Sequence, residues 1–412
     1  MSDGIDAPSA IDRYAGVPIC AFLSLVDRLL PRRAPATPPR NILIVLLSEM
    51  GSLVLAQPMF ARLKKRHPGA AVHILLLGKN REVVDTLGVV PRENVIAIDD
   101  GSLVAFARDS LSALRRLRAT GIDVVIDCEL FARISAIFSY LSGAAVRVGF
   151  HRHTQEGLYR GSLVNRPVMY NPYRHMSRQF LTLANAIEST SSPVGKDEAD
   201  DGAALESPML DFTQRELDDV AARLRADYPA IAGKPLALVY AGGGVLPVRA
   251  WPLAHFQSLS TALLRDGYAV AAIGLPADRP EGEAIVAHCA NPLCVNLAGW
   301  TRSVRELVAL FRHAALLVTN DGGPAQFSPL ARIPTVALFG PETPALYAPL
   351  GGRVECMHRA LPCSPCLTAY NHRRTPCDGD NQCLKRIAPD EVLVRARAVV
   401  DHPSASGADT RA

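Results

Sequence analysis

Short apolar runs alternate with longer segments of mixed polarity along most of the chain. From residue 41 onwards the runs NILIVLL, AVHILLL and DVVIDC are separated by stretches long enough to form helices. After residue 208 the alternation restarts with LALVYAG, YAVAAIG, CVNLAG, LLVTND and TVALFG. Continuous apolar strands separated by helices are typical of parallel sheets that helices cover on both faces. The pattern predicts an α/β fold with two doubly wound, Rossmann-like domains.

Proline-rich and polar segments set the predicted boundaries. PRRAPATPP at residues 31–39 cannot continue a helix because proline lacks the amide donor. The stretch around residues 190–208 is polar and contains a DEADD run, which indicates an exposed connection. We therefore expect an N-terminal extension and linker (1–40), a first domain (41–190), a linker (191–208), a second domain (209–402) and a disordered tail (403–412). Ligands of such sheets bind beyond the carboxyl ends of the strands, so we expect a site in a cleft between the domains.

Composition narrows the class of protein. The chain has 412 residues, of which 49% are hydrophobic, and its formal net charge of +4 is too weak to predict nucleic-acid binding. No stretch has the pattern of a secretory signal or the length of a membrane span, and the nine cysteines fit a reducing compartment. We expect a cytoplasmic protein.

One apolar segment near the N-terminus has two interpretations. Residues 19–30 are apolar except for Ser24, Asp27 and Arg28, and Arg32 and Arg33 follow. The segment is either a helix in peripheral contact with the inner membrane or a short helix packed on the body of the protein.

The most specific chemical signal is the end of the run LLVTND. The strand ends at Asp321, and a turn of Gly322, Gly323 and Pro324 opens a helix. A helix N-terminus exposes backbone amides and carries about +0.5 charge, which favours a phosphate, and the glycines allow a diphosphate to approach closely. A purely structural strand, turn and helix is the alternative.

This segment resembles glycosyltransferase family nine, the ADP-heptose:lipopolysaccharide heptosyltransferases. The family carries D-S/T-G-P-x-H and, after a helix, P-T-x-x-L-F-G-P-T-x-P; here the corresponding stretches are DGGPAQ (321–326) and PTVALFGPETP (334–344). Gly322 replaces the family hydroxyl and Gln326 the family histidine, although glutamine still donates a hydrogen bond. Gly340 forms the second glycine turn.

The resemblance covers roughly residues 41–400 and implies a GT-B fold, with the donor nucleotide on the second domain and the acceptor on the first. It implies inverting transfer of a heptose-like sugar from a nucleotide-diphosphate donor, which is ADP-linked in the family, to a lipopolysaccharide core or other lipid-linked or glycan acceptor of the cell envelope. No Asp-x-Asp pair is present where a catalytic metal would be expected, so we expect no cofactor to be required for catalysis.

Two further segments resemble the donor-binding loops of the family. Gly242 and Gly243 end a strand, and Arg249 follows with paired donors for a phosphate. Trp251 belongs to the same pattern, with the role of a core anchor as the alternative. Glu283 is the carboxylate expected to meet the donor ribose, and Glu281 is its rival.

The first domain departs from the family at the catalytic position. VLLSEMGSLVLAQP matches the family's opening strand and Met-Gly turn, but Ser52 follows Gly51 where the family places its aspartate base. A serine hydroxyl cannot act as a general base without a base of its own, although it caps helices well. Glu49 is the predicted substitute; the alternatives are His151, His153 or a loss of transfer.

Two more groups complete the predicted site. Arg147 and Arg152, with Arg160 and Arg174 nearby in sequence, are expected to bind an anionic acceptor, with solvated surface charge as the alternative. Cys363, Cys366, Cys377 and Cys383 are material for a structural zinc site, which some family members share, or are free thiols.

Two other functions are weighed against transfer. A nicotinamide-dependent oxidoreductase would need G-x-G-x-x-G after the opening strand, and EMGS stands there instead. A degenerate family member would bind a nucleotide sugar or glycan without transferring it, an alternative raised by Ser52, Gly322 and Gln326.

Overall fold

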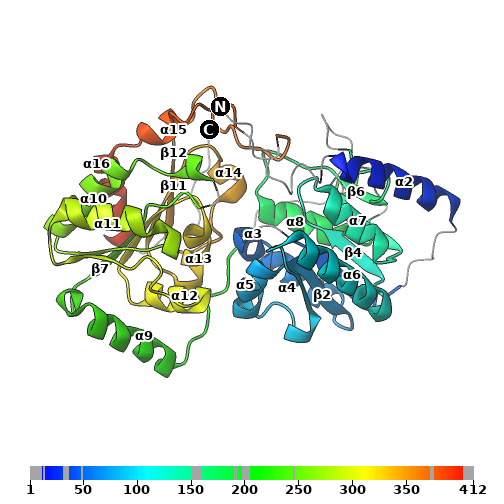
Figure 1. Cartoon of the computed structure of the whole chain (residues 1–412), viewed down its shortest axis with the longest axis horizontal. Helices are drawn as coiled ribbons and strands as arrows, with labels where there is room; N and C mark the ends of the chain where they lie inside the picture. Colours follow the sequence, from blue (N-terminus) through cyan, green and yellow to red (C-terminus); the bar gives the residue numbers. More distant parts are fainter. Residues whose placement is uncertain are drawn as a thin grey trace. The chain divides into compact units, whose positions relative to one another are not determined.

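The computed structural model describes residues 12, 14–30, 37–47, 50–150, 159–189, 191, 193–196, 205–244, 246–371 and 375–401. The chain divides into two compact units, residues 1–202 and 203–412 (Figure 1). Each unit contains a six-stranded sheet, and every strand pair within each sheet is parallel. The prediction of an α/β protein with two doubly wound sheets is confirmed.

The sheet of the first unit has the strand order β3-β2-β1-β4-β5-β6. Its strands are β1 (Asn41–Val45), β2 (Ala71–Leu77), β3 (Val95–Ile98), β4 (Val124–Asp127), β5 (Val146–Phe150) and β6 (Arg166–Val168). Its helices are α2 (Gly16–Leu29), α3 (Met50–Leu55), α4 (Gln57–Arg66), α5 (Arg81–Leu87), α6 (Leu103–Thr120), α7 (Arg133–Leu141) and α8 (Met176–Asn185). Apolar residues of α6 and α7 pack with those of β1, β2 and β4 in one core. The order reverses between β1 and β4, which is where doubly wound sheets form their crevice.

The sheet of the second unit has the order β12-β11-β10-β7-β8-β9. Its strands are β7 (Leu236–Tyr240), β8 (Ala269–Ala272), β9 (Cys294–Asn296), β10 (Leu316–Asn320), β11 (Thr335–Phe339) and β12 (Val354–His358). Its helices are α9 (Gln214–Asp227), α10 (Leu253–Arg265), α11 (Arg279–Cys289), α12 (Val304–Arg312), α13 (Gly323–Ala331), α14 (Pro344–Tyr347), α15 (Gln382–Lys385) and α16 (Pro389–Asp401). The reversal here lies between β7 and β10.

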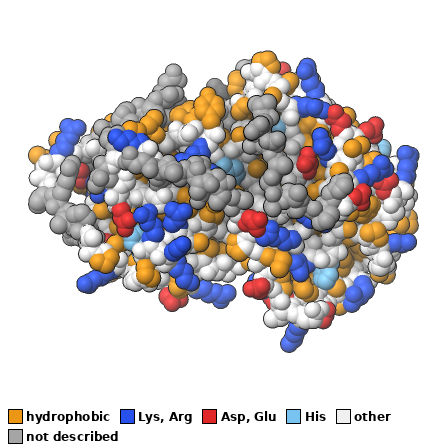
Figure 2. All heavy atoms as spheres, turned by 180° about the vertical axis from the view of Figure 1, so that it is seen from behind, with side chains coloured by type: hydrophobic (Ala, Val, Ile, Leu, Met, Phe, Trp, Pro, Cys, Tyr) orange, Lys and Arg blue, Asp and Glu red, His pale blue; other side chains and the backbone are white. Residues whose placement is uncertain are grey.

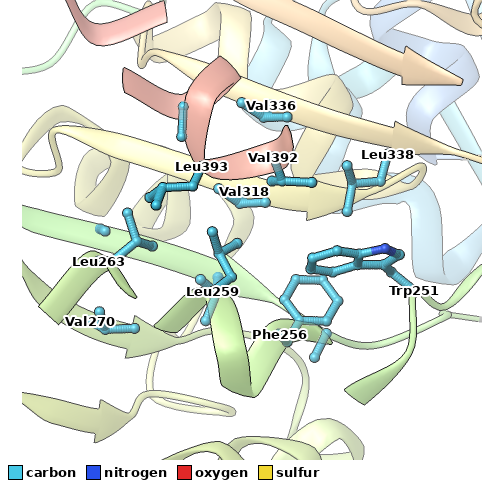
Figure 3. Close-up of a cluster of buried hydrophobic side chains, with 14 of the residues drawn as sticks. Trp251, Phe256, Leu259, Leu263, Val270, Val318, Val336, Leu338, Val392 and Leu393 are labelled. Carbon is cyan, nitrogen blue, oxygen red and sulfur yellow. The ribbon is translucent and has the colours of Figure 1, made fainter. Parts of the chain in front are cut away.

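The core of the second unit lies under α10 and α16 (Figure 3). It joins Trp251, Phe256 and Leu259 to strand residues such as Val318 and to Val392 of the last helix. The C-terminal segment therefore completes this unit, as α16 packs against α10.

Charged side chains are mixed over the surface. Figure 2 shows Lys and Arg side chains interspersed with acidic and hydrophobic ones. Among the described residues, no helix is both long and apolar enough to cross a bilayer.

Candidate functional site in the second unit

Three predicted turns lie at one edge of the second sheet. β10 pairs with β7 on one side and β11 on the other, in parallel register. The turns at Gly242, Asp321 and Gly340 follow these three strands, so the fold brings all three to the same edge. This edge is the candidate donor site.

The turn after β10 opens α13 without a side-chain cap. Gly322 is the N-cap residue, so the N-cap position provides no side-chain hydrogen bond to the first turn of the helix. Uncapped amides at a helix N-terminus suit an anion. A Cβ added at Gly322 would meet nothing closer than 4.0 Å, so the packing leaves space for the hydroxyl side chain of the family pattern.

Asn320 ties two of the turns together. Its buried side chain accepts a hydrogen bond from the Trp251 amide at 3.0 Å and donates one to the Gly242 carbonyl at 2.9 Å. The sequence interpretation missed Asn320, although a polar residue at the end of the buried run LLVTN was a signal. It acts by holding the β7 turn in place.

Trp251 lies in the core. Its side chain is 1% exposed, and its indole N–H donates to the Ile387 carbonyl at 3.0 Å. Its ring packs edge-on against Phe256 (Figure 3). This arrangement favours the alternative of a core anchor over a contact with the donor.

Arg249 is held by two buried carboxylates. Its Nη2 lies 2.6 Å from Glu342 Oε1, and its Nε lies 3.9 Å from Asp321 Oδ2. Glu342 stands where the family pattern has threonine. Burial raises the pKa of Asp321 and of Glu342, and the guanidinium lowers both in part. The predicted phosphate-binding arginine is therefore already paired, and the cluster carries net negative charge when both acids are ionised.

Two predicted donor residues are anchored by packing. Gln326 is buried, and its Nε2 donates to the Tyr347 carbonyl at 2.7 Å, so it links α13 to α14. A Cβ at Gly340 would lie 2.5 Å from Leu384 Cγ, so the close approach of α15 requires glycine.

The two carboxylates predicted to meet the ribose differ in burial. Glu283 is exposed on α11, whereas its rival Glu281 has a buried Oε2 without a hydrogen-bond partner in the described part of the chain. Asp278 also lies here: its carboxylate accepts from the Leu275 amide at 2.7 Å and would contact any Cβ at Gly242. Sequence analysis missed Asp278.

Candidate functional site in the first unit

Several predicted residues of the first unit fall outside the described residues. These are Glu49, Arg152 and the two alternative bases His151 and His153. Gly51 and Ser52 lie in the first turn of α3, partly buried. Their predicted roles remain untested.

Glu129 is a buried carboxylate that binds the backbone at the end of the segment following β1, and it was not among the residues predicted from the sequence. It follows β4, the neighbour of β1, and its Oε1 accepts a hydrogen bond from the Leu47 amide at 2.6 Å. The Leu47 carbonyl accepts from Asn80 Nδ2 at 2.6 Å. The backbone that leads into the turn before Ser52 is thus fixed on both sides at the strand-order reversal.

A strained residue lies two positions after Glu129. Phe131 has φ of 65° and is fully buried, with its ring packed edge-on against Tyr170. A bulky residue in the left-handed region costs of the order of 1–3 kcal/mol, and such strain clusters at functional sites.

The predicted acceptor-binding arginine Arg147 is a structural residue. Its guanidinium is buried, lies 3.1 Å from Asp27 Oδ1, and donates to the Leu163 and Ala144 carbonyls at 2.6 and 3.0 Å. Each of its three guanidinium nitrogens already donates within the unit, and the side chain is buried, which favours a structural role over contact with an acceptor. Its ion pair joins α2 to β5.

Arg160 is likewise internal. It forms a fully buried ion pair with Asp127 at 2.9 Å and donates to the Phe150 carbonyl at 2.9 Å. Two of the four arginines expected to bind an anionic acceptor, Arg147 and Arg160, are therefore buried inside the unit.

The four cysteines Cys363, Cys366, Cys377 and Cys383 are free thiols in the structure. Over the described residues no three His, Cys, Asp or Glu side chains are arranged to hold a metal ion.

Comparison with known proteins gives a consistent result. The family model described as glycosyltransferase family 9 (heptosyltransferase) matches residues 110–374. Lipopolysaccharide heptosyltransferase 2 of Salmonella typhimurium is 24% identical over 360 residues, covering 86% of this chain and 96% of that protein. Lipooligosaccharide heptosyltransferase 2 of Haemophilus influenzae is 25% identical over 317 residues, covering 76% of this chain and 87% of that one.

Solved structures support the fold. ADP-heptose lipopolysaccharide heptosyltransferase II of E. coli superposes with a TM-score of 0.64 at 21% identity, covering 87% of this chain and 98% of that chain. The family 9 glycosyltransferase of Veillonella parvula gives a TM-score of 0.67 at 17% identity, covering 88% and 97%. The predicted GT-B class is confirmed.

Proposed function

Because the chain belongs to glycosyltransferase family 9, the heptosyltransferases, we propose that it transfers a heptose-like sugar from an ADP-linked donor to a lipopolysaccharide core or other cell-envelope glycan. Transfer proceeds with inversion. The observation that carries this proposal is the uncapped N-terminus of α13 beside the Gly242 and Gly340 turns.

The donor lies on the second unit in this proposal. Its diphosphate accepts hydrogen bonds from the first amides of α13, at Gly322 and Gly323, and is balanced by the helix dipole and by Arg249 once Glu342 is neutralised. No metal cofactor is required for this balance. The ribose hydroxyls meet Asp278, which lies against Gly242, or Glu281, whose carboxylate is close enough to raise the pKa of Tyr240 at the end of β7.

The acceptor lies on the first unit. Its hydroxyl attacks the anomeric carbon on the face opposite the diphosphate, a C–O bond forms, and the bond to the leaving diphosphate breaks. A carboxylate takes the hydroxyl proton. Glu49 is the proposed base, with Gly51 and Ser52 shaping the turn that presents it, and Arg152 is the remaining proposed acceptor contact.

Glu129 is a second candidate for the base. It is a buried carboxylate at the strand-order reversal, next to the turn where the family aspartate stands. Glu129→Gln keeps the hydrogen bond from Leu47 because the amide oxygen still accepts, so a loss of transfer with unchanged folding would assign the base to Glu129. Glu49→Gln is the matched comparison.

The acceptor is proposed to be lipid-linked, and the protein to act in the cytoplasm at the inner face of the membrane. No nucleic acid takes part. A structural zinc at the four cysteines stays a prediction that metal analysis of the purified protein tests: one equivalent of zinc would support it, and none would assign the cysteines as thiols.

A degenerate member that binds the donor without transfer is the second candidate. Ser52 lacks a carboxylate, and the Arg249 cluster opposes a diphosphate while both its acids are ionised. Transfer to an acceptor separates the two functions.

Calorimetric titration with ADP-, UDP-, GDP- and CMP-sugars tests the proposal. We expect one nucleotide sugar, the ADP-linked one, to bind and to release its nucleotide slowly. Failure of all four to bind would leave the glycine turns purely structural and would sink the proposed function.

A further inference from the structure

The N-terminal helix α2 exposes its large apolar side chains to solvent, unlike an ordinary surface helix. The residues that it buries are small or polar, namely Gly16, Cys20, Ser24 and Asp27, and Leu23 packs beside Cys20 as a partly buried apolar contact. The side it turns outward is apolar: Phe22 is 64% exposed, Leu25 54% and Leu29 75%. An ordinary surface helix buries the apolar stripe instead.

Specific contacts fix this orientation. A Cβ at Gly16 would lie 2.8 Å from Arg133 Cδ, so α2 packs closely on α7 (Figure 1). Ser24 Oγ accepts a hydrogen bond from the Ser162 amide at 2.8 Å. The Asp27 carboxylate pairs with the buried Arg147 at 3.1 Å. Rotating the helix to bury Phe22 and Leu25 would break all of these contacts, so the apolar face must stay outward.

The charged residues of this segment also differ in where they lie: its acids face inward, and Arg28 faces solvent. Asp12 is paired with Arg133 at 3.0 Å and Asp27 with Arg147, whereas Arg28 is exposed. In the sequence Arg32 and Arg33 follow directly. Within the described residues, the outward face therefore combines an apolar stripe with the cation Arg28, while the carboxylates of Asp12 and Asp27 are paired with buried arginines.

This combination fits an anionic lipid surface better than a second copy of the chain. Apolar side chains enter the boundary between headgroups and acyl chains, and each Lys or Arg near an anionic membrane contributes about 1 kcal/mol. A second copy would bring its own arginines to this face, and both described carboxylates of the segment are already paired.

We propose that the outward face of α2 seats the protein on an anionic phospholipid surface, with Phe22 and Leu25 in the acyl boundary and Arg28 among the headgroups. The inference deepens the proposed function, on which it rests for the lipid-linked acceptor. It names the surface that keeps the enzyme where such an acceptor lies.

Sedimentation with vesicles tests this proposal on the full chain. The vesicles contain phosphatidylethanolamine and phosphatidylglycerol, and pure phosphatidylcholine is the neutral comparison. Phe22→Ser with Leu25→Ser should lower the partition coefficient at least about tenfold, and Arg28→Gln about fivefold. The matched control is Leu103→Ser with Val104→Ser, which removes two apolar residues that are 70% and 79% exposed on α6.

Several results would overturn the proposal. The first is a wild-type protein that stays in the supernatant with anionic vesicles. The second is an equal loss of vesicle binding in the α6 control. The third is a dimer that becomes monomeric in the α2 variant while vesicle binding persists. Nucleotide-sugar binding in solution, measured on the same α2 variant, should be unchanged; a chain that binds vesicles but no nucleotide sugar would sink the proposed function and leave the membrane surface standing.

Discussion

The cluster of Arg249, Glu342 and Asp321 predicts that donor binding is linked to proton uptake. One guanidinium, which stays charged, serves two carboxylates that are 3% and 8% exposed. A diphosphate arriving at this edge adds negative charge, so one carboxylate must become neutral. Glu342 is the nearer partner of Arg249 and the one whose protonation releases it.

The sign and size follow from the pKa shifts. Burial raises the pKa of Glu342, and a bound diphosphate would raise it further. The protonated form that favours binding is present at low pH and is lost as pH rises through that raised pKa. Each pH unit above it costs about 1.4 kcal/mol, or up to tenfold in Kd. Glu342→Gln removes this cost and should strengthen binding about tenfold or more at alkaline pH.

The assay is calorimetric titration across the range from about pH 6 to pH 8, over which proton linkage is expected. An ADP-hexose is the appropriate probe because its diphosphate diester does not itself titrate there. The wild-type Kd should rise steadily with pH, and that of Glu342→Gln should stay nearly flat. Glu306→Gln is the matched control, since Glu306 also pairs with an arginine, Arg223, at 2.6 Å in the same unit.

Equal pH slopes for the wild type and Glu342→Gln would refute this reasoning. So would weaker binding by Glu342→Gln at every pH, because the carboxylate would then be orienting Arg249 for the donor instead of competing with it.

Two further predictions concern stability. Gly340→Ala should lower the free energy of unfolding by about 1–3 kcal/mol, because its Cβ would meet the buried Leu384 at 2.5 Å. Gly322→Ala should change the free energy of unfolding little, because its Cβ would have open space. Urea denaturation of both variants compares them. Arg160→Met should cost about 3–5 kcal/mol by leaving Asp127 buried and unpaired. Burial already raises the pKa of Asp127, and removing Arg160 raises it further, so the stability lost in Arg160→Met should be larger at about pH 8 than at about pH 5. Thermal melts that show a pH-independent loss of stability would contradict this.

The sequence predicted the sheets because most strands are continuous apolar runs with turn residues at their ends. It did not predict β3 (Val95–Ile98) or β5 (Val146–Phe150), whose apolar runs are short. It also did not predict β6, whose three residues include Arg166 and Pro167, or β12, which contains Glu355 and His358 and is only partly buried. Short or polar edge strands carry too little pattern to be separated from loops.

The sequence indicated the glycine turns of the site, but not the ion pairs and hydrogen bonds that its polar side chains form. Glycine turns are local signals, and they lie together as expected. Whether an arginine is solvated, buried or paired depends on residues far away in sequence: Asp27 lies 120 residues from Arg147, and Glu342 lies 93 residues from Arg249. Asn320 was not predicted for the same reason, because the turn that it holds lies 78 residues earlier in the sequence.

The most direct test of the central claim is a transfer assay with ADP-heptose and a lipopolysaccharide core acceptor, followed by mass spectrometry of the acceptor. We expect the acceptor to gain one heptose and ADP to appear in equal amount. A protein that binds ADP-heptose but leaves every acceptor unmodified would contradict transfer and favour the degenerate binding function.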